Sequence, residues 1–324
     1  MTKILVTGCL GFIGAHFVKY VLDNTDFSVI GFNRNSDQRN AMRLPRLCDI
    51  HGRYYDRFNL VFGDLLDTSA ISGICEDVDY IVNFAAKTFV DHSIKDPAPF
   101  TKNNVVGTYN LLEDARRYKS TLKKYIQVST DEVYGAILDG AYREDSRLNP
   151  TNPYSASKAA GDLLCISYFN TYGLPVIITR TENNFGEFQH PQKAIPKFVR
   201  YALEGRKLPV YGDGEHRRMW LYVLDHCIAI LHLLEHGKDG EIYHVAGEQE
   251  LSNNELAKKI LDIMGLDEKL IEHIDDYNIR PGHDRRYALN VDKLKGLGWM
   301  PRFGLDSALR QTVMWYMSNR WWMV

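Results

Sequence analysis

Short apolar runs alternate with longer amphipathic segments through the first half of the chain. The runs are rich in β-branched residues and continuously apolar, as strands covered on both faces are. They lie at 4–7, 29–32, 60–62, 80–84, 125–129 and 176–179. Segments of helical length lie between them, at 13–24, 104–118 and 155–171. This alternation predicts an α/β fold in which a doubly wound parallel (Rossmann) sheet carries helices on both faces.

The pattern changes after about residue 185, where Pro, Gly and charged residues become frequent and apolar runs become sparse. A helix is still indicated at 253–264. We therefore expect two domains with a soft boundary and interleaved segments. The first, at 1–185, is a dinucleotide-binding Rossmann domain that carries the catalytic residues. The second, at 186–324, is a smaller α/β domain that binds the substrate.

A glycine-rich segment at 7–14 (TGCLGFIG) directly follows the first expected strand and opens the first expected helix. Gly8 permits a tight turn, Gly11 lets the backbone approach a pyrophosphate, and Gly14 allows the helix to pack closely on the strand. The free N–H groups at the start of that helix attract phosphate. The motif in this context predicts a dinucleotide site.

The end of the second expected strand determines which dinucleotide is bound. An acid there favours NAD, whereas a nearby Arg accommodates a 2′-phosphate. The chain has Asn33, Arg34 and Ser36 at this point and no acid beside them. Arg34 and Ser36 form either a phosphate contact or a solvated loop, so both NAD and NADP remain open.

The composition excludes several classes of protein. The 324 residues include 41 acids and 39 bases, which disfavours nucleic-acid binding because phosphate contacts need concentrated Lys and Arg. No apolar stretch approaches the ~20 residues of a membrane span. The five cysteines contain no Cys-x-x-Cys pair, so no metal site or redox dithiol is indicated. We expect a soluble, cytoplasmic protein with reduced thiols.

Tyr154 and Lys158 are four residues apart, about one turn of the helix expected at 155–171. A phenol with its usual pKa of about 10 is a poor base at neutral pH. A neighbouring ammonium lowers that pKa and favours the phenolate. Such a tyrosine can take the proton of an alcohol while a bound dinucleotide takes the hydride.

Three polar residues, Thr130, Asp131 and Glu132, lie at the carboxyl end of the strand expected at 125–129. Open α/β sheets build their sites at this end. Adjacent carboxyl groups serve as a general acid and a general base when their surroundings separate their pKa values. We therefore expect this cluster to belong to the catalytic site.

These motifs resemble those of the extended short-chain dehydrogenase/reductase superfamily and, within it, the dTDP-glucose 4,6-dehydratase family. The resemblance covers nearly the whole chain. Its motifs are TGCLGFIG at 7–14, STDEVYG at 129–135, NPYSASK at 152–158, LPVYGDG at 208–214 and RPGHDRRY at 280–287. The glycine and Tyr-x-x-x-Lys motifs mark the superfamily, whereas the Thr-Asp-Glu and Arg-Pro-Gly-His blocks are specific to the dehydratases.

The resemblance implies a lyase that removes water from a nucleotide hexose to give the 4-keto-6-deoxy sugar, with NAD(P)⁺ retained through the cycle. Tyr154, helped by Lys158 and Thr130, removes the 4-hydroxyl proton as hydride leaves C4. Glu132 takes the C5 proton and Asp131 protonates the departing 6-hydroxyl. A homodimer formed through the helices at 104–118 and 155–171 is also implied.

The resemblance also implies two sets of binding residues. Those for the cofactor are Gly8, Gly11, Phe12, Ile13, Gly14, Asn33, Arg34, Ser36, Asp64, Leu65, Ala85, Ala86, Tyr154 and Lys158. Those for the nucleotide sugar are Lys87, Asn183, Lys193, Tyr211, Arg218, Asn253, Arg280 and His283. The guanidinium groups suit a diphosphate because their planar fork matches phosphate oxygens.

The chain departs from the family pattern around these sites. Lys87 and Phe89 replace the usual Glu and His, Met219 replaces Asp, and Glu182 replaces Ser. The preferred sugar nucleotide is therefore open, with UDP-, CDP- and GDP-linked or N-acetylated hexoses as alternatives. A related epimerase or decarboxylase, which needs the Tyr/Lys pair but not the Asp-Glu pair, is the second hypothesis. A non-catalytic dinucleotide sensor is the third.

Overall fold

The computed structural model describes residues 1–34, 38–275, 280–281 and 283–323. Its central element is a seven-stranded sheet in which every neighbouring pair is parallel. In spatial order the strands are β10 (Ile242–Val245), β6 (Val176–Thr181), β5 (Lys124–Thr130), β4 (Tyr80–Asn83), β1 (Lys3–Thr7), β2 (Ser28–Asn33) and β3 (Phe58–Phe62). The predicted doubly wound α/β sheet is confirmed.

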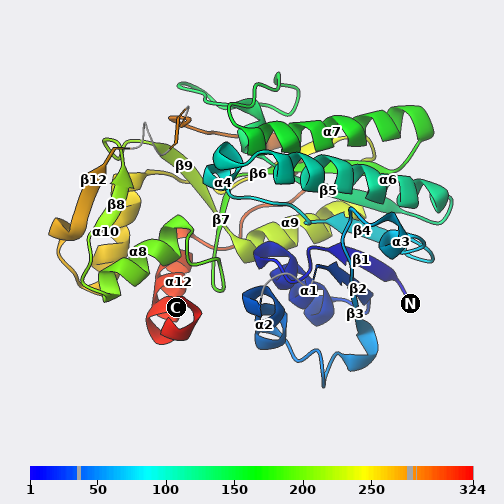
Figure 1. Ribbon diagram of the computed structural model, residues 1–324, viewed down its shortest axis with the longest axis horizontal. Helices are drawn as coiled ribbons and strands as arrows, with labels where there is room; N and C mark the ends of the chain where they lie inside the picture. Colours follow the sequence, from blue (N-terminus) through cyan, green and yellow to red (C-terminus); the bar gives the residue numbers. More distant parts are fainter. Residues whose placement is uncertain (35–37, 276–279, 282, 324) are drawn as a thin grey trace.

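Helices cover both faces of this sheet (Figure 1). One face carries α1 (Phe12–Asn24) and α9 (Val223–His236), with α2 (Gln38–Leu47) packed against α1. The other carries α6 (Gly107–Arg117) and α7 (Pro153–Tyr172), with the short α3 (Thr68–Ile71) against α6. A π-helical segment at Thr101–Val106 runs directly into α6, following the short helices α4 (Val90–Lys95) and α5 (Ala98–Phe100).

Alternate residues of the central strands fill two hydrophobic cores. Val6, Val82 and Ile126 pack with the α1/α9 face, while their neighbours Leu5 and Ile81 pack with the α6/α7 face. Successive side chains of a strand point to opposite faces, so a strand covered on both sides is apolar at every position. This is the physical reason for the unbroken apolar runs in the sequence.

The rest of the chain builds a smaller region beside the carboxyl ends of β5 and β6 (Figure 1). Its strands form a three-stranded sheet, β11 (Glu250–Ser252), β9 (Arg217–Tyr222) and β7 (Asn183–Phe185), and a pair, β12 (Ile271–Ile274) and β8 (Leu208–Tyr211). Its helices are α8 (Ala194–Leu203), α10 (Asn253–Met264) and α12 (Leu305–Ser318), whereas the short α11 (Asp292–Gly296) packs against β10 of the large sheet. Strands are therefore present here, but all except the six-residue β9 have only three or four residues, which leave little periodicity in the sequence.

The chain crosses between the two regions more than once. After β9 it returns to the large sheet as α9 and β10, and β10 pairs with β6 as the outermost strand. The segment after residue 283 then runs back past the carboxyl end of the sheet, where Tyr142 and Leu289 form an isolated bridge. Residues from both halves of the sequence are thereby brought to one end of the large sheet.

Candidate functional site

The glycine-rich loop has no room for a side chain at its glycine positions. Gly8 has a φ of +67° and its N–H donates to the Phe32 carbonyl at 2.8 Å. A Cβ on Gly8 would lie 2.8 Å from the Ala85 nitrogen, and one on Gly11 would lie 2.9 Å from the Gly8 oxygen. The loop thus leaves a bare backbone at the N-terminus of α1, where Phe12 and Ile13 begin the helix. This cradle fits a dinucleotide pyrophosphate.

Of the three glycines in this loop, Gly14 has the least space for a Cβ atom. A Cβ there would come within 2.3 Å of the Gly8 carbonyl oxygen, a backbone atom that cannot rotate away. We expect Gly14→Ala to lower the free energy of unfolding by about 1–3 kcal/mol and to weaken dinucleotide binding, because α1 must move away from the loop. Gly296→Ala is a suitable control, since a Cβ at Gly296 meets nothing within 4 Å. Thermal melting and NAD⁺ titration of the two variants measure both effects, and equal behaviour would contradict this packing role.

The expected cofactor residues beyond the loop gather at the ends of β2, β3 and β4. The Asn33 amide accepts the Leu10 N–H at 3.3 Å and donates to the Arg34 carbonyl at 2.7 Å. Arg34 faces Asp64 at 3.6 Å, and Leu65 is buried next to it. Ala85 and Ala86 follow β4 directly, where the Ala85 N–H donates to Asn83 Oδ1 at 3.2 Å. Ser36 lies outside the described residues.

Tyr154 and Lys158 are both buried in the first turns of α7, with 7% and 5% of their surfaces exposed. Burial raises the pKa of Tyr154, the charge of Glu132 raises it further, and a hydrogen bond with the Thr130 hydroxyl lowers it. Burial also lowers the pKa of Lys158, whose ammonium donates to the Val128 carbonyl at 2.7 Å. The phenol of Tyr154 is therefore next to Thr130 and Glu132. The expected lowering of its pKa by the Lys158 ammonium is wrong, because burial and the charge of Glu132 raise this pKa instead.

The Thr-Asp-Glu cluster lies at the carboxyl end of β5. The Thr130 hydroxyl donates to Asp131 Oδ1 at 3.0 Å and accepts the Glu132 N–H at 3.3 Å. Burial raises the pKa of Asp131 to about 7, with Glu132 adding to the effect and the Thr130 hydrogen bond and Arg218 opposing it. Burial also raises the pKa of Glu132, but Arg280, Lys193 and Arg218 oppose that change. The two carboxyls thus have different surroundings, with the cations nearest to Glu132.

Three of the expected substrate residues, Lys193, Arg218 and Arg280, form a cationic wall whose charges act on Glu132. Two more, His283 and Tyr211, lie beside these arginines. Arg280 and Arg218 both reach His283 Nε2, at 3.2 and 3.3 Å. Burial and these guanidinium groups lower the pKa of His283, so its ring is neutral. Lys193 donates to the Thr88 carbonyl at 3.2 Å, which places it beside the β4 loop.

The other three expected substrate residues come from different elements. Asn183 begins β7 and pairs with Trp220, and Asn253 is the first residue of α10. Lys87 lines a cavity together with Arg34 and so faces the end of β2 where the cofactor residues gather. Lys87 lies in the loop after β4, and the sequence did not indicate in which direction its side chain points.

Residues that sequence reasoning missed hold the catalytic helix in place. The Asn104 amide donates to Ser157 Oγ at 2.9 Å, and the Ser93 hydroxyl accepts the Tyr154 N–H at 3.2 Å. Asn152 caps α7 through the Ser155 N–H at 3.0 Å and also bonds to Glu132. The Asn-Pro pair before the Tyr-x-x-x-Lys motif was a readable helix-start signal, but its link to Glu132 was not.

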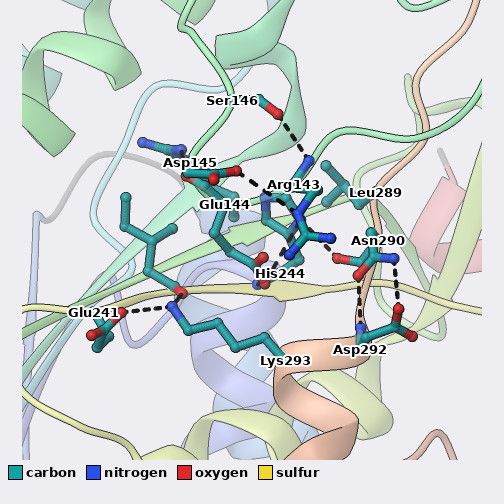
Figure 2. A network of polar contacts seen from close by, with 12 residues as sticks. Arg143, Glu144, Asp145, Ser146, Glu241, His244, Leu289, Asn290, Asp292 and Lys293 are labelled. Carbon is teal, nitrogen blue, oxygen red and sulfur yellow. Dashed lines mark hydrogen bonds and ion pairs between the residues drawn. The ribbon is translucent and has the colours of Figure 1, made fainter.

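A buried polar network supports the same strand end from the β10 side. Tyr134, two residues after the Thr-Asp-Glu cluster, bonds to His244 Nε2 at 2.7 Å, and His244 Nδ1 reaches the Asn290 carbonyl at 2.9 Å. Figure 2 shows His244 between Glu144 and Asn290, with Lys293 reaching Glu241. Burial lowers the pKa of His244 to about 3, so the network carries a neutral ring at physiological pH. The returning chain is thereby fixed against the edge of the sheet.

Within the described ranges no group of three His, Cys, Asp or Glu side chains could hold a metal ion. The five cysteines are free and buried. Among the helices described, none combines the length and the apolarity needed to cross a bilayer.

Comparisons with known proteins agree over nearly the full length. A family model described as GDP-mannose 4,6 dehydratase matches residues 5–312. The chain is 45% identical to the low-salt glycan biosynthesis protein Agl12 of Haloferax volcanii, over 98% of this chain and 99% of that protein. It is 42% identical to the dTDP-glucose 4,6-dehydratase of Streptomyces niveus, over 99% and 94% of the two chains. The crystal structure of DesIV, a dTDP-glucose 4,6-dehydratase of Streptomyces venezuelae with NAD bound, matches with a TM-score of 0.91 and 41% identity, covering 99% of this chain and 98% of that one.

Proposed function

The chain belongs to the GDP-mannose 4,6-dehydratase family, and from this premise we propose that it removes water from dTDP-glucose to give the 4-keto-6-deoxy sugar nucleotide, with NAD as its cofactor. One observation supports this best. The carboxyl pair Asp131-Glu132 lies at the end of β5, next to Tyr154 and opposite a cationic wall. A dehydratase needs an acid and a base beside its alcohol-oxidising tyrosine, whereas an epimerase or decarboxylase does not need this pair.

The side chains divide the reaction between them. Tyr154 takes the proton of the sugar 4-hydroxyl, which Thr130 helps to orient. The chemistry that bound NAD supplies is the temporary removal of hydride from the sugar. The 4-ketone acidifies the C5–H bond, so Glu132 takes that proton and Asp131 gives its own proton to the 6-hydroxyl as the C6–O bond breaks and water leaves. Glu132 then returns its proton to C5 as C6 receives the hydride taken from C4, which saturates the C5–C6 double bond left by the loss of water.

Thr130 also offers a way to reset the site. Each turnover leaves one proton more on Tyr154 and one fewer on Asp131, because Tyr154 keeps the 4-hydroxyl proton while Asp131 gives its own proton to the departing water. The Thr130 hydroxyl bonds to both groups, and both are more than nine-tenths buried. Transfer from Tyr154 through Thr130 to Asp131 restores the starting state within the protein.

The pKa of Asp131 predicts the alkaline limit of the reaction. Asp131 works as an acid only while it holds its proton, and burial places its pKa at about 7. We therefore expect kcat/KM to fall about tenfold per pH unit above that value. The Asp131→Asn variant has no proton to lose at this position, so the residual activity should lack this limb. If kcat/KM of Asp131→Asn still falls above the same pH, the fall must be caused by the ionisation of another group.

The resemblance to the family also implies an oligomeric state and a cellular location for the protein. We propose a homodimer formed through α6 and α7, which lie side by side on one face (Figure 1). Large apolar side chains on this face are exposed: Val106 by 42%, Tyr109 by 44%, Leu163 by 56% and Tyr172 by 40%. Exposed apolar side chains grouped on a helix face usually mark a surface that is buried against another protein chain.

A cytoplasmic location is supported by the five free, buried cysteines.

Mass spectrometry of the products from a panel of sugar nucleotides tests the proposed reaction. The panel contains dTDP-glucose, UDP-glucose, UDP-N-acetylglucosamine, CDP-glucose, GDP-mannose and UDP-glucuronate. We expect loss of one water, fastest from dTDP-glucose. Preferred loss of water from another member would correct the substrate, while isomerisation at constant mass or loss of carbon dioxide would overturn the dehydratase assignment.

A further inference from the structure

A buried arginine with no part in the proposed reaction joins two loops of the site. Arg43 lies in α2, and only 2% of its surface is exposed. Its Nη1 donates to the Leu10 carbonyl of the glycine-rich loop and to Asn40 Oδ1, the latter at 2.7 Å. Its Nε donates to the Phe188 carbonyl at 3.0 Å. One side chain therefore ties the glycine-rich loop to the loop at 186–190, which directly follows β7.

Contacts on several sides hold the 186–190 loop in one conformation. Phe188 has a φ of +61°, which residues with large side chains rarely adopt. The Trp322 indole donates to the Gln189 carbonyl at 2.8 Å, and its ring lies 5.2 Å from that of Phe188. The Arg43 guanidinium lies 5.1 Å from the centre of the same indole. A backbone of this kind persists only where its surroundings fix it, so these contacts determine the path of the loop.

The 186–190 loop leads directly to a cation of the substrate wall. The Lys193 N–H donates to the His190 carbonyl at 2.9 Å, so the end of the loop sets the start of α8. The Lys193 ammonium lies 4.6 Å from the centre of the Phe89 ring, and its charge acts on Glu132. A change in the path of the loop would therefore move one of the cations that face Glu132.

The other end of the Arg43 connection fixes the glycine-rich loop. Leu10 lies between Gly8 and Gly11, two positions where the loop has no space for a Cβ atom. Leu10 is itself buried, and a buried carbonyl without a hydrogen-bond partner costs free energy. Arg43 supplies that partner and also brings a positive charge to a loop that suits a negatively charged pyrophosphate.

We propose that Arg43 is a positioning residue shared by the dinucleotide site and the nucleotide-sugar site. It acts through the backbone of the two loops, whose carbonyls its planar fork holds at the same time. The inference rests on the proposed function in taking the glycine-rich loop as the NAD site and Lys193 as a contact of the nucleotide diphosphate. Without the guanidinium, both loops lose a bond that fixes them, and both sites lose affinity.

Calorimetric titration of the nucleotide-free protein with NAD⁺ and, separately, with dTDP tests this role. Arg43→Met is expected to weaken each ligand by about tenfold, because the two carbonyls lose their donor. Arg43→Lys keeps the charge but not the planar fork, so it should weaken each ligand by about threefold. The lysine variant also provides the test if the methionine variant fails to fold.

Arg57→Met is the matched control. Arg57 likewise donates to backbone carbonyls, those of Phe27 and Leu22 at 3.1 Å, but it connects only segments beside α1 and β2. Its loss removes the same kind of bond away from both loops. We expect the affinities for NAD⁺ and dTDP to change by less than about twofold.

A double-variant experiment separates positioning from a general loss of stability. In a Lys193→Met background, Arg43→Met should weaken dTDP by less than about twofold, because the cation that the loop places is gone, while its effect on NAD⁺ stays near tenfold. An equal loss of dTDP affinity in both backgrounds would overturn the proposal, as would unchanged NAD⁺ affinity in Arg43→Met. If the product panel identifies a different substrate, the nucleoside diphosphate of that substrate replaces dTDP, and the NAD⁺ titrations decide independently of any dehydration.

Discussion

Replacement of Tyr154 by Phe is expected to lower kcat by about a thousandfold, because the 4-hydroxyl then has no group to take its proton. The substitution removes one oxygen atom from a side chain that is 7% exposed, so the packing of α7 is preserved. The Thr130 hydroxyl would keep its bond to Asp131 at 3.0 Å. Steady-state rates of dTDP-glucose consumption measure the loss, and NAD⁺ titration should show unchanged cofactor binding.

Tyr168→Phe is the matched control on the same helix. Its hydroxyl donates to Glu113 Oε1 at 2.5 Å, far along α7 from the Thr-Asp-Glu cluster. Loss of that bond is expected to cost about 0.5–1.5 kcal/mol of stability and to leave kcat unchanged. A Tyr154→Phe variant with a rate near that of Tyr168→Phe would show that another group removes the proton.

The second large effect is expected for Glu132→Gln, which should lower the rate of water loss by about 10²–10⁴-fold. The amide cannot take the C5 proton, but Tyr154 and Thr130 remain in place to act on the 4-hydroxyl. The variant should therefore still develop the absorbance of reduced nicotinamide when substrate is added, and then stop. In heavy water the recovered sugar should carry no deuterium at C5.

Glu182→Gln provides the control, since Glu182 is also a buried carboxyl near Asp131. Burial holds the pKa of Glu182 well above its usual range, and its Oε1 accepts the Leu289 N–H at 3.0 Å. An amide keeps this acceptor and the neutral charge, so water loss should continue at close to the normal rate. Deuterium at C5 in the Glu132→Gln product would assign the base to a different residue.

Local features of the fold were predictable from the sequence because local patterns determine them. Helix α10 has the expected bounds, Asn253–Met264, and its start is marked by a capping box of Ser252 and Glu255. The apolar runs matched strands of the large sheet to within two residues at each end. By contrast, β7 and β11 have three residues each and carry no detectable periodicity. Of the π-helical segment Thr101–Val106, only residues 104–106 were expected to be helical, as the start of the regular helix predicted at 104–118.

Long-range placement was the part that the sequence could not supply. The glycine loop and the Tyr154/Lys158 pair each lie within one short segment, so their geometry followed from helix and turn rules. The meeting of Glu132 with Arg280 depends instead on a return of the chain after almost 150 residues. Lys87 illustrates the same limit, because only the path of α5 and its neighbours shows that it shares a cavity with Arg34.

The position of β10 has a consequence for how the protein is made. During synthesis β6 leaves the ribosome about sixty residues before β10, and until β10 pairs with it β6 is the open edge of a hydrophobic parallel sheet. At about 5–20 residues per second this edge stays uncovered for several seconds. An uncovered edge strand is a template for pairing with another nascent chain. The risk of aggregation, and with it the need for chaperones, is therefore greatest in this interval. A polypeptide that stops at residue 185 would keep that edge permanently, and aggregation rather than folding is its expected fate.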